Sequence, residues 1–353
     1  MIRSEAYVLV AAGKPFERRT MELDLASDED VIVEVTACSL CHTDLGFASG
    51  GVAPKKGLPI VLGHEIVGKV VAARGELERL VGHRVLVPAV MPCGKCAYCA
   101  AGRGNACPKQ KMPGNDIDGG FATHVIVPGN SLVPLDEVPA QFDWRELSVV
   151  ADAVSTAYQA IRRAALAKGD LAIVVGSGGV GGYAIQIARA LGARVVACDV
   201  SAERLAMVKD FGAERTIDVK GRPPKDVRKD VQAIAKEWNV PSLSHRIFEC
   251  SGTTDGQLLA YTLIGPASTM VQTGYTPKPV EVRLSNLMAF DATVHGTWGC
   301  PPSAYGDVLR LIYDRKVVIT PFITHSPMSR IDAVMDDMAN HRLTQRVIFD
   351  PRT

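Results

Sequence analysis

A glycine-rich segment at residues 176–181 limits the folds open to this chain. It reads Gly-Ser-Gly-Gly-Val-Gly and matches the pattern G-x-G-x-x-G. An apolar run over residues 171–175 precedes it, and apolar residues at helical spacing over 180–191 follow it. Asp199 ends the next apolar run, 21 residues after Gly178. Glycines alone are a weak signal. The whole pattern predicts a dinucleotide-binding βαβ unit, because a strand, a glycine turn, a helix and a distant acid follow one another in this order.

The glycines of this segment have separate expected roles. Gly176 permits a tight turn, Gly178 lets the backbone approach a pyrophosphate, and Gly181 lets the helix pack closely on the strand. The helix N-terminus offers unpaired N–H groups to the phosphates. The alternative is an accidental glycine-rich loop. The cofactor-binding residues expected here are Gly176, Gly178, Gly179, Val180, Gly181, Asp199 and Arg204.

The acid at the end of the second strand predicts the type of dinucleotide. Asp199 is expected to accept hydrogen bonds from the adenosine ribose, and its charge would repel a 2′-phosphate. We therefore expect NAD rather than NADP, although Arg194 and Arg204 are able to offset that charge.

The two parts of the chain differ in their apolar pattern. From about residue 155, continuous apolar runs alternate with helical stretches, which predicts a doubly wound parallel sheet in an α/β fold. These runs cover residues 171–175, 194–198, 246–248, 268–272 and 293–296, with a helix at 202–211. The first 150 residues instead carry short strand-like runs broken by Gly and Pro, which predicts a barrel-like β domain. Those runs cover residues 6–12, 31–35, 66–72, 84–87 and 122–127. The end of the chain is mixed, with helices near 305–313 and 330–341 and a strand at 347–349.

Length and charge narrow the functional classes. The chain has 353 residues, enough for about two domains. Its 39 Lys and Arg residues against 38 Asp and Glu residues give no electrostatic reason to expect nucleic acid or an anionic membrane as a partner. No apolar run approaches the roughly 18 residues of a membrane span, and no signal peptide is expected. We expect a cytoplasmic protein.

Four of the nine cysteines lie close together in the sequence. Their spacing, C-x2-C-x2-C-x7-C, predicts a closed tetrahedral zinc site with a structural role, while an iron–sulfur cluster is the alternative. These ligands are Cys93, Cys96, Cys99 and Cys107. The odd total and the cluster argue against a disulfide framework.

Three further residues form a second candidate metal set. Cys41, His64 and Asp152 together would bind zinc and leave a fourth position open. Each residue also has an alternative interpretation when it is considered alone. Cys41 would be a small core residue, His64 a hydrogen-bonded core histidine and Asp152 a helix cap. Asp152 stands among apolar residues, where an unpaired carboxylate is costly.

The segments C-H-T-D and G-H-E, the four-cysteine loop and the glycine pattern occur in the order found in zinc-dependent medium-chain alcohol dehydrogenases. The resemblance covers essentially the whole chain. It implies a GroES-like catalytic domain at residues 1–154 and 297–353, and an inserted Rossmann domain at residues 155–296. It also implies an NAD-dependent enzyme with two zinc ions per chain.

The resemblance assigns roles to individual residues. It implies catalytic zinc on Cys41, His64 and Asp152, with Glu65 beside the metal as a possible exchanging ligand. Asp44 is similar to the carboxylate that orients the ligand histidine, and Thr43 to the hydroxyl that takes the substrate proton. His42 and Arg346 correspond to positions near the cofactor pyrophosphate.

Two positions depart from the family pattern. The third ligand, often Cys, is Asp152, whose oxygen is compatible with zinc. The distal relay histidine of the family would fall at Gly46, so proton exit beyond Thr43 needs water or another group.

Two segments, residues 107–122 and 150–156, resemble those of 6-hydroxycyclohex-1-ene-1-carbonyl-CoA dehydrogenases of anaerobic benzoyl-CoA degradation. This implies oxidation of a cyclic acyl-CoA alcohol to its 6-oxo product. CoA phosphates need cations, so Lys55 and Lys56 are candidate contacts, with a solvated surface pair as the alternative reading. The other candidate substrates are a small alcohol, a polyol or threonine, and a non-enzymatic NAD(H) sensor is a remote alternative. The resemblance also implies a homodimer or homotetramer.

Overall fold

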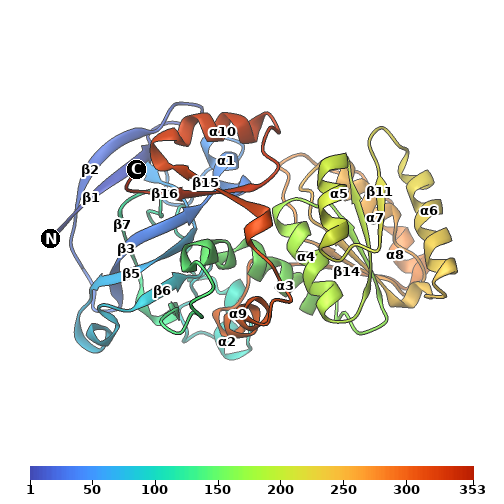
Figure 1. Cartoon of the computed structure of the whole chain (residues 1–353), viewed down its shortest axis with the longest axis horizontal. Helices are drawn as coiled ribbons and strands as arrows, with labels where there is room; N and C mark the ends of the chain where they lie inside the picture. The colour runs from blue at the N-terminus through green and yellow to red at the C-terminus, as the bar shows by residue number, and fades with distance from the viewer. The chain divides into compact units, whose positions relative to one another are not determined.

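The computed structural model describes residues 1–353, which form two compact units. The first comprises Met1–Ser155, Gly299–Arg310 and Ile319–Thr353, and the second comprises Thr156–Trp298 and Leu311–Val318. Both chain ends belong to the first unit (Figure 1). None of the helices has the length and apolar character needed to cross a membrane.

The first unit is built on two β-sheets. A seven-stranded sheet has the order β15-β16-β3-β5-β6-β8, with β7 also paired to β3, and a three-stranded sheet has the order β2-β1-β4. All pairs are antiparallel except β15 with β16. The strands are β1 (Ile2–Leu9), β2 (Glu17–Leu23), β3 (Asp30–Ser39), β4 (Ile60–Val61), β5 (Glu65–Ala72), β6 (Arg84–Val87), β7 (His124–Pro128), β8 (Val133–Pro134), β15 (Ile323–Pro327) and β16 (Arg346–Asp350).

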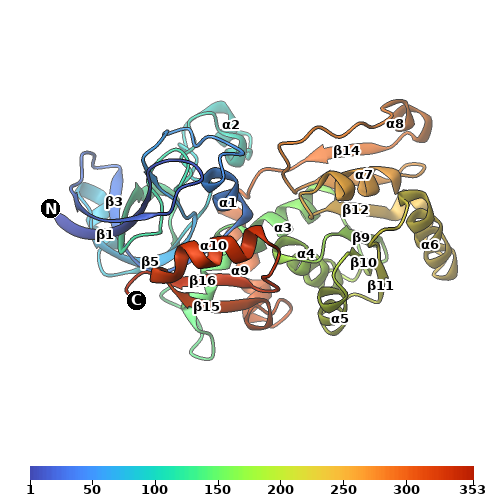
Figure 2. The same cartoon turned by 90° about the horizontal axis from the view of Figure 1, so that it is seen from above.

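Helical segments of the first unit carry or support the candidate site. They are α1 (His42–Ala48), α2 (Ala97–Ala100), α9 (Tyr305–Tyr313, which ends in the second unit), α10 (Ile331–Ala339) and the 3-10 helix η4 (Trp144–Ala151). The loop over residues 93–118 contains α2, the 3-10 helix η2 (Gly104–Ala106) and isolated β-bridges, but no longer helix or strand. Figure 2 shows α10 beside the paired strands β15 and β16.

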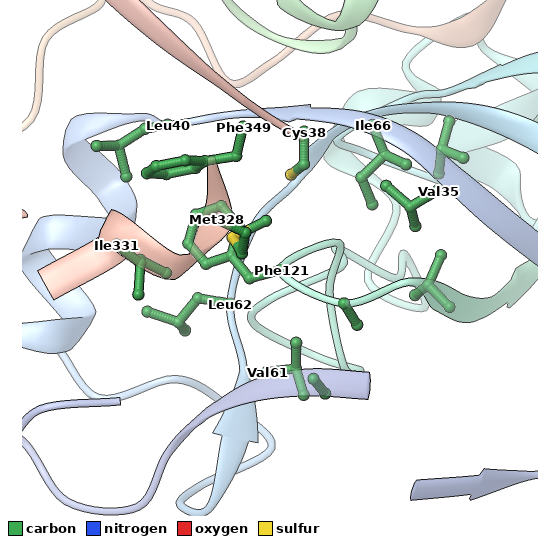
Figure 3. Close-up of a cluster of buried hydrophobic side chains, with 14 of the residues drawn as sticks. Val35, Cys38, Leu40, Val61, Leu62, Ile66, Phe121, Met328, Ile331 and Phe349 are labelled. Atoms are coloured by element: carbon green, nitrogen blue, oxygen red, sulfur yellow. The ribbon is translucent and has the colours of Figure 1, made fainter. Parts of the chain in front are cut away.

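The core of the first unit joins residues from both ends of its sequence. Phe121, fully buried, meets the Phe349 ring edge-on with centroids 5.6 Å apart. Cys38 and Ile66 from the central strands and Met328 from the C-terminal part belong to the same cluster (Figure 3). The C-terminal strand thus completes the core that β3 and β5 begin.

The second unit contains one six-stranded parallel sheet with the order β11-β10-β9-β12-β13-β14. The strands are β9 (Leu171–Val175), β10 (Arg194–Asp199), β11 (Arg215–Asp218), β12 (His245–Glu249), β13 (Thr269–Gln272) and β14 (Thr293–Gly296). Numbered from β9, this order is 3-2-1-4-5-6, the doubly wound arrangement in which ligands bind where the strand order reverses. That reversal lies between β9 and β12, and the glycine segment begins at the residue after β9.

Helices cover both faces of this sheet. They are α3 (Ala153–Arg163, which begins in the first unit), α4 (Gly179–Ala190), α5 (Ala202–Asp210), α6 (Pro224–Glu237), α7 (Thr254–Thr262) and α8 (Ser285–Phe290). Leu171, Ile173 and Val175 share a core with α6 and α7. The intervening residues of β9 are buried as well, which explains why this strand is apolar throughout.

Most of the predicted elements are confirmed. The predictions at 84–87, 171–175, 293–296 and 305–313 match β6, β9, β14 and α9 to the residue. The others are displaced by one to four residues; β1, for example, covers Ile2–Leu9 rather than 6–12. The predicted α/β fold, with a β-rich unit and a parallel-sheet unit, is likewise confirmed.

Candidate functional site

The first zinc-ligand candidate stands where β3 ends and α1 begins. Cys41 is the N-cap residue of α1, and its backbone N–H donates to Asp44 Oδ2 at 2.9 Å. An acid at the third helical position satisfies a donor that would otherwise be unpaired at the helix start. The segment C-H-T-D therefore folds into a short capped helix that fixes the Cys41 thiol.

The same carboxylate holds the second candidate ligand. Asp44 Oδ1 accepts from the Gly63 N–H at 3.1 Å and lies 3.3 Å from His64 Nδ1. His64 and Asp44 are both fully buried. Burial, the largest single influence, lowers the pKa of His64, but the charge of Asp44 and the contacts with Asp44, Asp152 and Cys41 together raise that pKa well above its ordinary value. The same negative surroundings favour a metal cation.

Asp152 reaches this cluster from the end of η4. Its Oδ2 lies 3.7 Å from Cys41 Sγ and 3.6 Å from His64 Nε2. The side chain of Asp152 keeps 18% of its exposure, against 1% for His64, so the cluster is open on the Asp152 side. The structure thus brings together the three predicted ligands.

Glu65 lies on the buried side of the same cluster. Its Oε1 accepts from Arg346 Nη1 at 2.8 Å and from the Ala153 N–H at 3.1 Å. Burial raises the pKa of Glu65 to about 7, and the Arg346 guanidinium opposes that rise. The other oxygen, Oε2, is buried without a hydrogen-bond partner.

Geometry and unsatisfied atoms test whether zinc fits here. With Zn–S near 2.3 Å and Zn–N or Zn–O near 2.0 Å, ligand atoms of a tetrahedral site lie about 3.3–3.5 Å apart. The separations of Asp152 Oδ2 from Cys41 Sγ and His64 Nε2 are close to that range. His64 Nε2 is also buried without a hydrogen-bond partner, which a metal bond would satisfy. Ligand atoms of Cys41, His64, Glu65 and Asp152 all lie within 4.8 Å of one another.

The four-cysteine loop forms a second, closed cluster. Cys96 Sγ lies 3.5 Å from Cys99 Sγ and 3.6 Å from Cys107 Sγ, and Cys93 Sγ lies 3.5 Å from Cys107 Sγ. These distances are far beyond a disulfide bond and match the edges of a sulfur tetrahedron around zinc. A hydrogen bond from the Cys99 backbone lowers the pKa of Cys96 to about 6, which favours the metal-binding thiolate.

The glycine segment has the predicted strand–turn–helix form. Gly176 has φ +90°, and a Cβ there would lie 2.6 Å from the Ser251 backbone. A Cβ on Gly181 would lie 1.7 Å from the Gly176 carbonyl oxygen, so only glycine fits. Gly178, the N-cap of α4, instead has room for a Cβ, whose nearest neighbour would be Arg204 Nη1 at 3.6 Å.

Asp199 anchors this segment from the end of β10. Its Oδ2 accepts from the Ser177 N–H at 2.6 Å, and its Oδ1 accepts from the Ser201 N–H at 2.9 Å. Glu249 has the same place at the end of β12 and was not predicted. It is buried, and its Oε1 accepts from Ser251 and Gly252. The sequence signal for both Asp199 and Glu249 is an acidic residue at the end of an apolar strand.

Other predicted site residues lie at different distances from the metal cluster. Thr43 Oγ1 lies 3.8 Å from Cys41 Sγ, whereas His42 is exposed on α1. Arg346 is buried, and its Nη1 donates to the Leu40 carbonyl as well as to Glu65. Its proposed place near the cofactor remains a prediction, and its ion pair with Glu65 is a feature that the sequence did not indicate.

The two candidate CoA-binding lysines already have carboxylate partners. Lys55 Nζ lies 3.4 Å from Asp116 Oδ1, and Lys56 Nζ lies 2.7 Å from Asp118 Oδ1. A CoA phosphate would have to compete with these two acids.

Comparison with known proteins assigns the chain to a family. The description "Alcohol dehydrogenase GroES-like domain" matches residues 27–137, and "Zinc-binding dehydrogenase" matches residues 179–314. The chain belongs to the zinc-containing medium-chain alcohol dehydrogenase superfamily. It is therefore a zinc-dependent oxidoreductase acting on a CH–OH group, and the two clusters correspond to a catalytic and a structural zinc.

Two curated relatives are similar to this chain in sequence over most of its length. An alcohol dehydrogenase of Geobacillus stearothermophilus is 29% identical over 352 residues, covering 98% of each chain. The L-galactonate-5-dehydrogenase of Escherichia coli (strain K12) is 28% identical over 305 residues, covering 86% of each.

Solved structures are similar over almost all of both chains. The alcohol dehydrogenase of the archaeon Aeropyrum pernix has a TM-score of 0.87 at 25% identity, covering 98% of this chain and 100% of its own. An Escherichia coli CFT073 dehydrogenase (rspB), solved with NADH, has a TM-score of 0.85 and 99% coverage of each chain, but at 21% identity it supports the fold alone.

Proposed function

We propose that this chain oxidises a small alcohol or polyol with NAD, at a zinc held by Cys41, His64 and Asp152. The observation that carries the proposal is the convergence of these three side chains, with His64 Nε2 buried and unpartnered. When bound, zinc would lower the pKa of a substrate hydroxyl, and the nicotinamide of NAD would accept the hydride.

The surrounding residues prepare the ligands and move the proton. Asp44 holds the His64 ring from its Nδ1 side, while the capped start of α1 fixes Cys41. Thr43, beside Cys41, is positioned to take the substrate proton through its hydroxyl. Gly46, where the family has a relay histidine, faces open space, so water is the natural path for that proton.

Glu65 and Arg346 form the inner wall of the site. Their buried ion pair keeps a second carboxylate next to the ligand set, while Glu65 also holds the Ala153 backbone. Glu65 Oε2, buried without a hydrogen-bond partner, would be a further ligand atom for zinc. An exchanging role for Glu65 follows from this arrangement.

The substrate class follows from the relatives and the lysine pairs. The curated relatives act, by their names, on alcohols and on L-galactonate. Because Lys55 and Lys56 are paired with acids, no free cation pair supports a CoA phosphate at that loop. We therefore prefer a small alcohol or polyol and treat the cyclic acyl-CoA alcohol as the competing substrate.

NADH formation on a substrate panel tests this proposal. The panel contains ethanol, cyclohexanol, sorbitol, L-galactonate, threonine and a cyclic hydroxyacyl-CoA thioester, each with NAD and with NADP. We expect the largest kcat/KM with NAD and one of the CoA-free alcohols. A kcat/KM for the thioester at least tenfold above every other substrate would instead support the CoA-linked function.

Two variants separate the chemistry from the fold. Asp152→Ala should lose activity and one of two zinc ions while the structural zinc remains. Thr43→Val should lose activity, whereas Thr43→Ser, which keeps the hydroxyl, should retain most of it. Full activity of zinc-depleted Asp152→Ala would contradict the metal assignment.

We also propose that the partner is a second copy of this chain, bound through the β14 edge. β14 is the last strand of its sheet (Figure 2), and three of its four residues are exposed. Val294 on β14 is 38% exposed, and Leu284 and Met288 in the preceding α8 segment are 69% and 78% exposed, so apolar area is exposed on the strand and on the helix before it. Val294→Lys should shift the mass measured by light scattering toward the monomer, and an unchanged oligomer would exclude this edge.

A further inference from the structure

The backbone around Asp152 has an unusual conformation. Asp152 lies between η4 and α3 with φ −137° and ψ −64°, outside both the helical and the extended regions. Its carboxylate must nevertheless reach Cys41 Sγ and His64 Nε2 within 3.7 Å. A ligand side chain keeps such geometry only if its own backbone is held in place.

Buried side chains hold three consecutive residues at this point. The Ala151 carbonyl accepts from Tyr305 Oη at 2.6 Å, and the Asp152 carbonyl accepts from Ser155 Oγ at 3.2 Å. The Ala153 N–H donates to Glu65 Oε1 at 3.1 Å. The backbone is therefore fixed before, at and after the ligand residue.

Tyr305 is the most distant member of this arrangement in sequence. It begins α9, 154 residues after Ala151, and only 1% of its surface is exposed. Ser155 Oγ also lies 3.3 Å from the Tyr305 hydroxyl, so the two hydroxyls form one buried group behind Asp152. The Ala151 carbonyl has two further donors within reach, the Ala89 N–H at 3.1 Å and Ser155 Oγ at 3.4 Å. The Ala151 carbonyl would therefore have a hydrogen-bond partner without Tyr305. The hydrogen bond from Tyr305 instead serves to fix the position of that carbonyl.

We propose that Tyr305 is a positioning residue for the third zinc ligand: by holding the Ala151 carbonyl, it sets the place of the Asp152 carboxylate. This inference rests on the proposed role of Asp152 as a ligand. Tyr305 would act through the backbone at Ala151 rather than as a ligand. Removing a group that orients a metal ligand typically lowers metal affinity ten- to a hundredfold, and because Tyr305 acts at one remove we expect about tenfold.

Zinc retention in Tyr305→Phe tests the proposal directly. The variant keeps the buried ring and removes only the hydroxyl. Purified protein is dialysed against a chelator, and the two zinc ions per chain are followed over time by metal analysis. We expect the catalytic zinc to leave about tenfold faster than in the wild type, and the four-cysteine zinc to leave at the wild-type rate. In the cobalt-substituted protein, the visible absorption bands of the catalytic site should shift.

Tyr261→Phe provides a matched control. Tyr261 is also buried, and its hydroxyl donates to the Arg283 carbonyl at 2.8 Å in the second unit, far in the chain from any proposed ligand. Like Tyr305→Phe, Tyr261→Phe loses one hydrogen bond from a tyrosine hydroxyl to a backbone carbonyl. Equal zinc loss from Tyr305→Phe and Tyr261→Phe would overturn the proposal, because it would show a general loss of stability.

Two further results keep the tests separate. If Tyr305→Phe does not fold, Ser155→Ala removes the hydroxyl that holds the Asp152 carbonyl and should also release the catalytic zinc faster, whereas wild-type retention would overturn the proposal. If Asp152→Ala binds as much zinc as the wild type, the ligand assignment itself is wrong. If Asp152→Ala loses one zinc but Tyr305→Phe behaves as the wild type, only the positioning role is wrong.

Discussion

Arg346 donates from Nη1 to Glu65 Oε1 at 2.8 Å, and both side chains are buried beside the zinc-ligand set. Arg346→Leu would leave the Glu65 carboxylate without its cation. Breaking a buried ion pair in this way costs about 3 kcal/mol, because one group stays buried and uncompensated. We expect that loss in denaturant unfolding of Arg346→Leu, with a large part recovered in the double variant Arg346→Leu, Glu65→Gln. If the double variant is no more stable than Arg346→Leu, the loss of stability in Arg346→Leu is not caused by the unpaired Glu65 carboxylate.

The structural zinc should be separable from the catalytic one. Cys96→Ser removes one of four thiolates that hold a loop with only short helical turns. We expect loss of one zinc per chain and rapid proteolysis within residues 93–118, while the catalytic zinc is retained. Cys198→Ala, which changes a buried cysteine in the sheet of the second unit, serves as the control and should keep both ions. Retention of two zinc ions by Cys96→Ser would contradict a four-thiolate site.

The fold was predictable where apolar pattern and buried surface coincide. β9 is apolar at every position because both of its faces are covered, and its limits were found from the sequence. β2 (Glu17–Leu23) was missed because it is an edge strand with mostly exposed, charged residues. β11 was missed for the same reason, since only Ile217 of its four residues is buried.

The candidate site was predictable only where its residues lie close in sequence or match a known pattern. The four cysteines and the glycine turn are local, so their spacing carried the information. Nothing in the sequence links Glu65 with Arg346, which lies 281 residues away, or Ala151 with Tyr305. Such contacts arise from packing of distant segments, and only the structure supplies them.

Two glycines of the dinucleotide segment should respond differently to substitution by alanine. A Cβ on Gly181 would lie 1.7 Å from the Gly176 carbonyl, so Gly181→Ala must displace the backbone and should cost about 3 kcal/mol in stability. Gly178 has no protein atom closer than 3.6 Å to a Cβ. Gly178→Ala should therefore keep its stability and weaken NAD binding by at least about tenfold, because the methyl group occupies the expected approach of the pyrophosphate.

Thermal unfolding and NAD titration measure these two effects separately. The expected pattern is a lowered Tm for Gly181→Ala and a raised Kd with an unchanged Tm for Gly178→Ala. If Gly178→Ala binds NAD as tightly as the wild type, the pyrophosphate does not approach that glycine.

His245, buried at the start of β12, should make stability depend on pH. Burial lowers the pKa of His245, and its Nε2 lies 3.3 Å from the Val240 carbonyl, to which it donates when neutral. The hydrogen bond to Val240 and the charge of Asp170 raise the same pKa, whereas Arg246 lowers it, and burial remains the largest influence. Because the folded-state pKa lies below the unfolded value near 6.5, the unfolded chain binds a proton that the folded chain does not. Stability is therefore highest above about pH 6.5 and falls as the pH decreases toward the folded-state pKa.

His245→Asn, which cannot be protonated in this range, should reduce that slope. We expect the free energy of unfolding of the wild type to fall more steeply between pH 6.5 and pH 5 than that of His245→Asn, as measured by denaturant titration at each pH. The comparison isolates one side chain, since the other groups titrate in both proteins. Parallel curves would mean that His245 is protonated equally in the folded and unfolded chains, which the burial of its side chain argues against.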